Sequence, residues 1–130
     1  MEPELQKKLM NDFPKLFNYR GKGSFVYFEC WGGWYDLIRE LCEKIYPLLK
    51  DDIEDDREMY AVQVKQKYGS LRFYMSHATD EIFDIIEEYE KKSTTICEDC
   101  GKPGYLNNKG WISTLCEEHH KSQNSSWKEG

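Results

Sequence analysis

The sequence lacks any apolar run long enough to cross a membrane, since a spanning helix needs about 20 consecutive apolar residues. The opening segment Met1-Glu2-Pro3-Glu4 has neither the basic nor the apolar region of a secretory signal peptide. We therefore expect a protein of the cytoplasm with no membrane partner. In that reducing compartment, the five cysteines are predicted to be metal ligands or buried thiols rather than disulfides. Cys42, on an apolar helical stripe, is predicted to be such a buried thiol.

The common catalytic signatures are also absent: there is no G-x-S-x-G elbow, P-loop, H-E-x-x-H helix or glycine-rich dinucleotide motif. Without a nucleophile, base and orienting group, we predict that the protein is not an enzyme. The formal charge of −6 argues against broad nucleic-acid affinity, which depends on neutralising phosphates. An acidic surface that binds basic proteins remains compatible with that charge.

The most specific pattern that is present lies near the end of the chain. Cys97-x-x-Cys100 is followed, after fifteen residues, by Cys116-x-x-His119. Three thiolates and one imidazole form a complete tetrahedral set for a structural zinc ion, with no position left open for catalysis. His120 is an alternative fourth ligand. Gly101 permits the tight turn of a zinc knuckle.

The rest of the chain predicts an α+β fold: a small antiparallel sheet packed with two or three helices, followed by a zinc ribbon or knuckle. We expect a core over residues 1–92, a zinc module docked on it over 93–120, and a flexible tail over 121–130. Apolar residues recur at helical spacing in 2–17, between Gly33 and Pro47, and after a Thr79 N-cap. Residues 24–30 have the aromatic and β-branched content of a strand.

A hairpin is predicted over residues 59–75, with Gly69-Ser70 as a two-residue type II′ turn. That turn places Lys67 opposite Arg72. The apolar face would hold Val62, Val64, Tyr68, Leu71, Phe73 and Met75, and the polar face Gln63, Lys65, Lys67, Arg72 and Tyr74. A directly opposed pair of cations is unfavourable unless something anionic lies above it.

Two interpretations of that pair remain open. Carboxylates from residues 51–58 or from the next helix can neutralise it, or it can bind an anionic ligand. The candidate ligand-binding residues are Lys65, Lys67, Arg72 and Tyr74, with Trp31, Trp34 and Tyr35 near them. The three aromatic residues at 31–35 can instead pack in the core or line a cleft.

Several motifs occur together in one order. They are Gly33-Trp34-Tyr35-Asp36-Leu37-Ile38 with Leu41-Cys42, residues 62–74, Cys97-x-x-Cys100-Gly101-x-Pro103-Gly104, and Gly110-Trp111-x-x-Thr114-Leu115-Cys116-x-x-His119. This order resembles a family of small zinc-binding proteins of tailed phages and prophages, over about residues 24–120. Lys67-Tyr68-Gly69-Ser70 departs slightly from the Lys-Phe-Gly-Gly form of that family. The resemblance implies a phage accessory protein that acts in the host cytoplasm, and it carries over no activity.

Three classes of function are compatible with these features. The first is a non-enzymatic inhibitor of host antiviral defence, which would bind a host protein or sequester a small nucleotide signal. The second is a zinc-containing nucleic-acid-binding regulator, which would have to use the hairpin because acidic residues flank the zinc ligands. The third is a scaffold or virion-assembly component, for which the sequence offers no specific feature.

Overall fold

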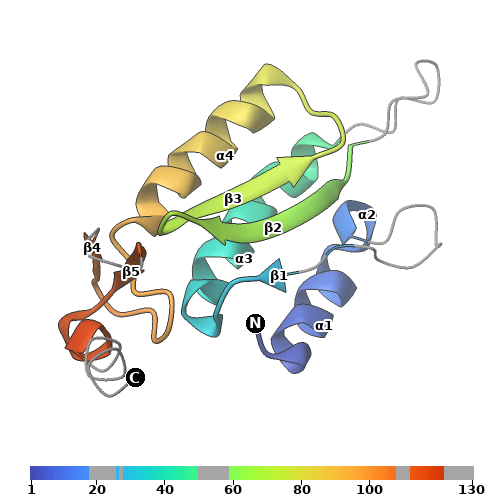
Figure 1. Ribbon diagram of the computed structural model, residues 1–130. Coiled ribbons are helices and arrows are strands. Elements are labelled where there is room, and N and C mark those ends of the chain that lie inside the picture. Colours follow the sequence, from blue (N-terminus) through green and yellow to red (C-terminus); the bar gives the residue numbers. More distant parts are fainter. Residues whose placement is uncertain (18–25, 27, 50–58, 108–111, 122–130) are drawn as a thin grey trace.

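The computed structural model describes residues 1–17, 26, 28–49, 59–107 and 112–121 (Figure 1). Within them the chain has the predicted α+β composition, with a three-stranded sheet in the order β1-β2-β3 and a two-stranded sheet of β4 and β5. The elements run α1 Pro3–Asp12, α2 Pro14–Phe17, β1 Phe28–Glu29, η2 Gly32–Trp34, α3 Tyr35–Ile45, η3 Tyr46–Leu48, β2 Ala61–Lys67, β3 Ser70–Met75, α4 Asp80–Ser93, β4 Tyr105–Asn107 and β5 Ser113–Leu115. None of the described helices is long and apolar enough to cross a membrane.

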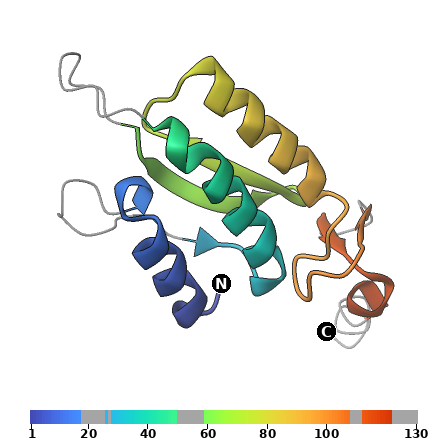
Figure 2. The ribbon, with the colours of Figure 1, turned by 180° about the vertical axis from the view of Figure 1, so that it is seen from behind.

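The larger sheet is mixed, and not purely antiparallel as predicted. β1 pairs with β2 in parallel, whereas β2 and β3 form an antiparallel hairpin. Two parallel strands need a crossover connection between them, and the connection from β1 to β2 contains α3, which allows the parallel pairing. The crossover places α3 against one face of the sheet, where it lies beside α4, as Figure 2 shows from behind.

The helical segment predicted over residues 2–17 is interrupted at Pro14 and forms two helices, because the backbone leaves helical geometry at Phe13 (φ −128°, ψ 60°). Pro14 disfavours helical geometry in the residue before it and starts α2 as its first residue. Of the strand predicted over residues 24–30, the structure describes Phe28–Glu29 as a strand. The acidic segment 51–58, Trp111 and Trp127 lie outside the described residues.

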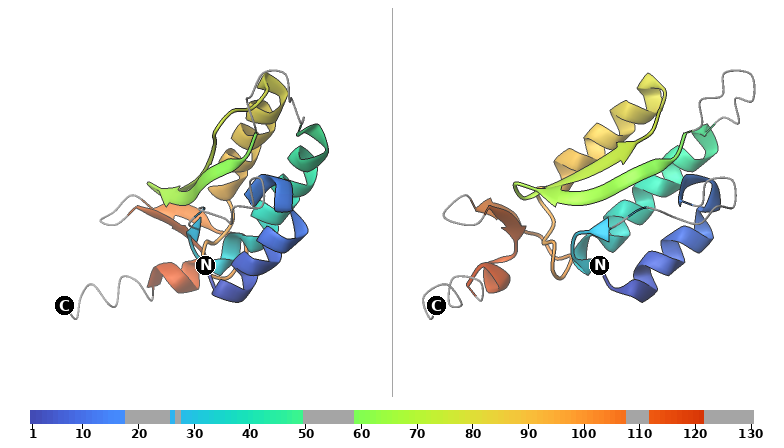
Figure 3. Two further views of the ribbon diagram at one scale, coloured as in Figure 1. Left: turned by 90° about the vertical axis from the view of Figure 1, so that its right-hand side faces the viewer. Right: turned by 45° about the vertical axis from the view of Figure 1, so that its right-hand side comes forward.

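All the longer helices pack on one side of the three-stranded sheet (Figure 3, left). Val64, Leu71 and Phe73 point into that side and are buried. The ring of Phe17 lies 5.4 Å from that of Phe28 and 6.4 Å from that of Phe73, which ties α2 into the same core. Cys42 is fully buried, as predicted, and burial raises the pKa of its thiol.

The outer edge of β3 is covered by side chains of α4. The N–H of Leu71 donates to Ser93 Oγ at 2.8 Å, and the N–H of Phe73 donates to Glu90 Oε2 at 3.1 Å. Thr79 caps this helix as predicted, since its Oγ1 accepts from the N–H of Ile82. An edge strand with free N–H groups is a template for aggregation, so α4 protects the hairpin as well as packing on it.

The hairpin turn lies one residue earlier than predicted. Tyr68 and Gly69 are the central residues, with φ values of 53° and 80°, which is the pattern of a type I′ turn rather than type II′. Lys67 therefore faces Ser70, and the directly opposed cations are Lys65 and Arg72. Gly69 takes this position because it also contacts β5: a Cβ there would lie 3.2 Å from the Ser113 main chain and 2.3 Å from the Leu106 side chain.

Two residues expected on the buried face of the hairpin are instead exposed. Tyr68 belongs to the turn, and its side chain is 68% exposed. Val62 is 42% exposed, because the register of the ladder shifts between Ala61 and Gln63 and an extra residue in one strand is left unpaired.

Replacing Tyr68 by asparagine is expected to stabilise the protein by about 1 kcal/mol. A non-glycine residue in the left-handed region costs about 1–2 kcal/mol, and asparagine tolerates it best. This gain exceeds the loss of the exposed cation–π contact between Lys67 and the Tyr68 ring, which is worth about 0.5 kcal/mol. The measurement is the denaturant midpoint of the metal-loaded protein, with Tyr68→Phe as the matched control. Equal midpoints for the two variants would show that no strain resides at this turn.

Candidate metal centre

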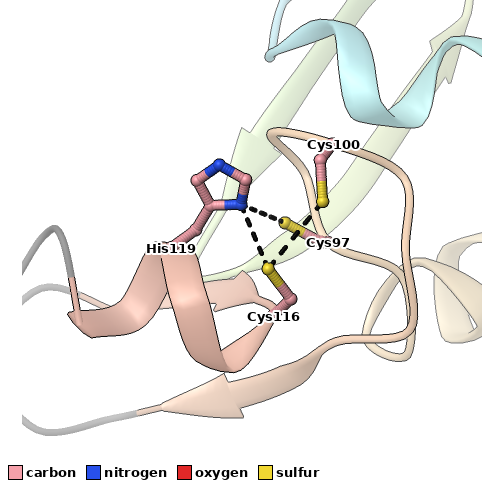
Figure 4. A group of neighbouring side chains, drawn as sticks. All are labelled: Cys97, Cys100, Cys116 and His119. Atoms are coloured by element: carbon pink, nitrogen blue, oxygen red, sulfur yellow. Dashed lines mark hydrogen bonds between the residues drawn. The ribbon is translucent and has the colours of Figure 1, made fainter.

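The four predicted ligand residues lie close together and can bind a metal ion. Cys97 Sγ, Cys100 Sγ, Cys116 Sγ and one nitrogen of His119 lie within 4.8 Å of one another. Figure 4 shows the four side chains pointing toward a common centre. Cys97 and Cys100 come from the turn after α4, whereas Cys116 follows β5 and His119 lies on the helical residues 117–121.

The geometry distinguishes the two neighbouring histidines. His119 directs Nδ1 toward the thiols, 3.1 Å from Cys116 Sγ and 3.5 Å from Cys97 Sγ. Its other nitrogen, Nε2, lies 3.5 Å from Asp99 Oδ2, the arrangement in which a carboxylate orients a metal-binding imidazole. His120 Nε2 instead donates to the carbonyl of Tyr105 at 2.8 Å, and the His120 and Tyr105 rings are in tilted contact, with centroids 4.4 Å apart and an interplanar angle of 38°. His120 therefore packs the module, and His119 faces the thiols.

The first cysteine pair occupies a tight knuckle. Gly101 has a φ of +80°, as its predicted role in the turn requires, and its N–H donates to the carbonyl of Cys97 at 2.9 Å. Burial opposes ionisation of the Cys97 thiol, but backbone N–H groups of Cys100, Cys116 and Asp99 donate to it and lower its pKa to about 7. These donors stabilise the thiolate, which is the form that binds a metal.

The knuckle rests directly on the backbone of Gly33. The N–H of Gly33 donates to the carbonyl of Glu98 at 2.7 Å, and a Cβ at Gly33 would lie 2.4 Å from the carbonyl oxygens of Cys97 and Glu98. Beside this contact, Trp34 Nε1 donates to the carbonyl of Ile96 at 2.9 Å. The sequence shows two adjacent glycines before a helix, but nothing in it indicates that the metal module packs on the second.

Glu98 joins the module to the core through its side chain as well. It is 4% exposed, its Oε2 accepts from the N–H of Trp31 at 3.1 Å, and its own N–H donates to the carbonyl of Thr114. Burial raises the pKa of this carboxyl to about 7, against the opposing effect of the Trp31 N–H. From the sequence, Glu98 is expected to be one of the acidic surface residues that flank the ligands, but in the structure it is buried.

A second contact links the module to the hairpin. Thr114 Oγ1 donates to the carbonyl of Gly69 at 2.6 Å, and Gln66 Nε2 donates to the carbonyl of Ile112 at 3.2 Å. The metal module is therefore attached to the core at two places, the start of α3 and the tip of the β2–β3 hairpin.

The candidate ligand-binding residues do not form one cluster. Trp34 is fully buried and is not available to stack on a ligand. Tyr35 is half-buried, and its hydroxyl accepts from Arg39 at 3.2 Å. Trp31 is 67% exposed, but its N–H donates to the Glu98 carboxylate, so it lies at the contact between the core and the metal module. The aromatic segment 31–35 thus divides between core and surface.

The four candidates on the hairpin do share a face. Lys65 and Arg72 are directly opposed, and Tyr74, opposite Gln63, is 38% exposed. Glu29 lies beside Lys65 on β1. Burial raises the pKa of the Glu90 carboxyl on α4, and the positive charge of the nearby Arg72 opposes this rise. The next helix therefore supplies one of the neutralising carboxylates considered above, and residues 51–58 lie outside the described structure.

No protein-family model, curated protein or solved structure matches this chain.

Gly33→Ala is expected to destabilise the protein by about 3 kcal/mol and to weaken metal binding, because its methyl group would displace the main chain of Cys97 and Glu98. Gly32→Ala is the matched control, since its Cβ would meet only Leu5 Cδ1, at the ordinary distance of 3.4 Å, and the Glu2 side chain. Its stability should change by less than about 1 kcal/mol. Thermal unfolding and a competitive chelator titration measure the two effects. Equal behaviour of the two variants would contradict the packing role of Gly33.

His119→Ala and Cys97→Ser are expected to lose the metal and to unfold at least the last quarter of the chain, because metal binding and folding are coupled in such modules. His120→Gln should keep one metal ion per chain, since glutamine can still donate to the Tyr105 carbonyl. Elemental analysis and far-UV circular dichroism of the purified variants test both expectations. Retention of metal by His119→Ala together with its loss from His120→Gln would reverse the assignment.

Proposed function

We propose that the metal is zinc and that its role is structural. In a tetrahedral zinc site with Zn–S bonds of about 2.3 Å, neighbouring sulfurs are about 3.8 Å apart. Cys100 Sγ and Cys116 Sγ are separated by 3.8 Å. Thiolate and imidazole donors favour zinc over harder cations such as Mg²⁺ or Ca²⁺. With Cys97 and His119 the set is complete, so such an ion would have no open position for a substrate.

We further propose that the protein is a non-enzymatic phage accessory protein that counters host defence by sequestering a nucleotide signal. The phage context comes from the resemblance of its motifs to small zinc-binding proteins of tailed phages. The choice of a nucleotide rests on one observation, the charge of the β2–β3 hairpin. Residues 59–79 contain three lysines or arginines and no aspartate or glutamate, in a chain of net charge −6.

The position of these cations supports binding rather than catalysis. Lys65 and Arg72 lie on the face opposite the buried Val64 and Phe73. An exposed tyrosine, Tyr74, lies beside them. Cations that hold phosphates and an aromatic ring that stacks on a base together recognise a nucleotide without chemical change. The runner-up target is a host protein, bound through the acidic remainder of the surface.

The test is native mass spectrometry of the protein purified without chelator from defence-proficient bacteria, together with phage plating on cells that express it. We expect one zinc ion per chain, a retained ligand of nucleotide mass, and increased plating. Lys65→Glu with Arg72→Glu should lose the ligand and the plating effect. Lys7→Glu with Lys8→Glu, which makes the same charge change at exposed positions of α1, should keep both.

Two results would contradict this function. A co-purifying host protein with no small ligand would move the assignment to a protein–protein inhibitor. Zinc alone, with no partner of either kind and unchanged plating, would remove the anti-defence role altogether.

A further inference from the structure

We infer that the hairpin face binds a short single-stranded oligonucleotide, and that two linked nucleotides are the smallest ligand that occupies it fully. The hairpin face is defined by Gln63, Lys65, Lys67, Arg72 and Tyr74 on the strands and Tyr68 in the turn. This inference rests on the proposed function and specifies the ligand class of its binding site.

The hairpin face lies away from the helices. Its strand residues alternate with the buried Val64, Leu71 and Phe73, so their side chains leave the sheet on the opposite side from α3 and α4. Figure 3 shows the longer helices all on the other side of β2 and β3. No described helix covers the hairpin face, and Lys67, Tyr68 and Tyr74 on it are exposed, so a ligand can reach them.

The cations provide two separate positions for phosphate. The N–H groups of Leu71 and Phe73 point away from β2, toward α4. The N–H of Arg72, which lies between them in the strand, therefore points toward β2. Lys65 and Arg72 are thus a hydrogen-bonded pair, with Cα atoms about 5.5 Å apart. They can hold one phosphate together. Lys67 lies two residues further along β2, a distance of about 6.6 Å. That separation suits the next phosphate of an extended strand better than a second oxygen of the same phosphate.

Each cationic position has an aromatic neighbour. Lys65 Nζ lies 5.8 Å from the centre of the Tyr74 ring, and Lys67 Nζ lies 5.9 Å from that of the Tyr68 ring. Both tyrosines are exposed, so their rings offer faces on which bases can stack. Alternating cations and aromatic rings on a strand face are the elements with which proteins hold single-stranded nucleic acid.

The conformation of Tyr68 is a second, independent observation. A tyrosine in the left-handed region (φ 53°) is unfavourable where asparagine would suit the turn better. Its ring is nonetheless 68% exposed, so burial of the ring does not compensate for this cost. An exposed aromatic residue kept at a strained position is expected when the ring itself contacts a ligand.

The length of the face limits the ligand. From Gln63 to Lys67 the strand spans about 13 Å, which accommodates two or three nucleotides. Glu29 lies beside Lys65 on β1, on the same side of the sheet, and the chain as a whole is acidic. Among the described strand residues of β2 and β3, the cations are Lys65, Lys67 and Arg72. A longer strand would meet the repulsion of the acidic chain, so the face suits a short oligonucleotide rather than a long nucleic acid.

The test is isothermal titration calorimetry of the zinc-loaded protein with thymidine monophosphate and with 5′-phosphorylated dT strands of 2, 3, 6 and 12 nucleotides, and with the matching 5′-phosphorylated rU series. We expect affinity to rise at least tenfold from the mononucleotide to the di- or trinucleotide and then to remain level. With two phosphates held, the logarithm of affinity should fall against the logarithm of salt with a slope of about −1.4.

Variants assign the effect to the hairpin face. Lys65→Gln with Arg72→Gln should lower affinity at least tenfold and reduce the salt slope to about −0.7, whereas Lys7→Gln with Lys8→Gln should change neither. Tyr74→Ala should weaken binding about tenfold, and Tyr74→Phe should restore it because stacking needs only the ring. Tyr68→Asn should weaken binding while raising the melting temperature, a combination that general damage to the fold cannot produce.

Four results would overturn the inference: equal affinity for thymidine monophosphate and the dinucleotide, affinity that keeps rising to 12 nucleotides, equally tight binding of an oligoglutamate peptide, or no binding of either series at millimolar concentration. Failure here is distinguishable from failure of the proposed function. A mononucleotide retained from cells, with increased plating, would preserve that function while rejecting the oligonucleotide.

Discussion

The packing of the knuckle on Gly33 joins the candidate metal site to the core of the protein. There the main chain of Cys97 and Glu98 approaches the start of α3 so closely that no side chain fits between them. The same residues shape the site, because Cys97 faces the other metal ligands and Glu98 accepts from Trp31. The position of the candidate metal site and the attachment of its module to the core are therefore set by the same few atoms.

A second chain of contacts runs from the module to the hairpin. β5 presents Thr114 to the carbonyl of Gly69, which holds the turn in the conformation that brings Tyr68 to the surface. On the far edge of the sheet, Ser93 and Glu90 of α4 occupy the outward N–H groups of β3. The hairpin is thus fixed at its tip and along its edge, before any ligand of the kind proposed above would bind. Preorganisation of this kind lowers the entropic cost of binding.

Most of the secondary structure was predictable from the sequence. Helical periodicity, the Thr79 cap and the alternation of β2 and β3 are local properties, so α3, α4 and the hairpin could be located without coordinates. The parallel pairing of β1 and the one-residue change in the turn could not, since each depends on an element distant in the chain. Because the turn lies one residue earlier than predicted, different residues face each other across the two strands. The directly opposed cations are therefore Lys65 and Arg72, and not Lys67 and Arg72 as predicted.

The donor set of the candidate metal site could be read from the sequence alone, because two short half-sites with the required spacing can reach one ion in almost any fold. The sequence also predicted that the hairpin would carry cations and aromatic residues. Tertiary packing makes His119 rather than His120 face the thiols, buries Trp34 and exposes Tyr68, and brings Gly33 against the knuckle. These outcomes depend on which backbones approach one another, and close approach between distant segments leaves no mark in the local pattern of either segment.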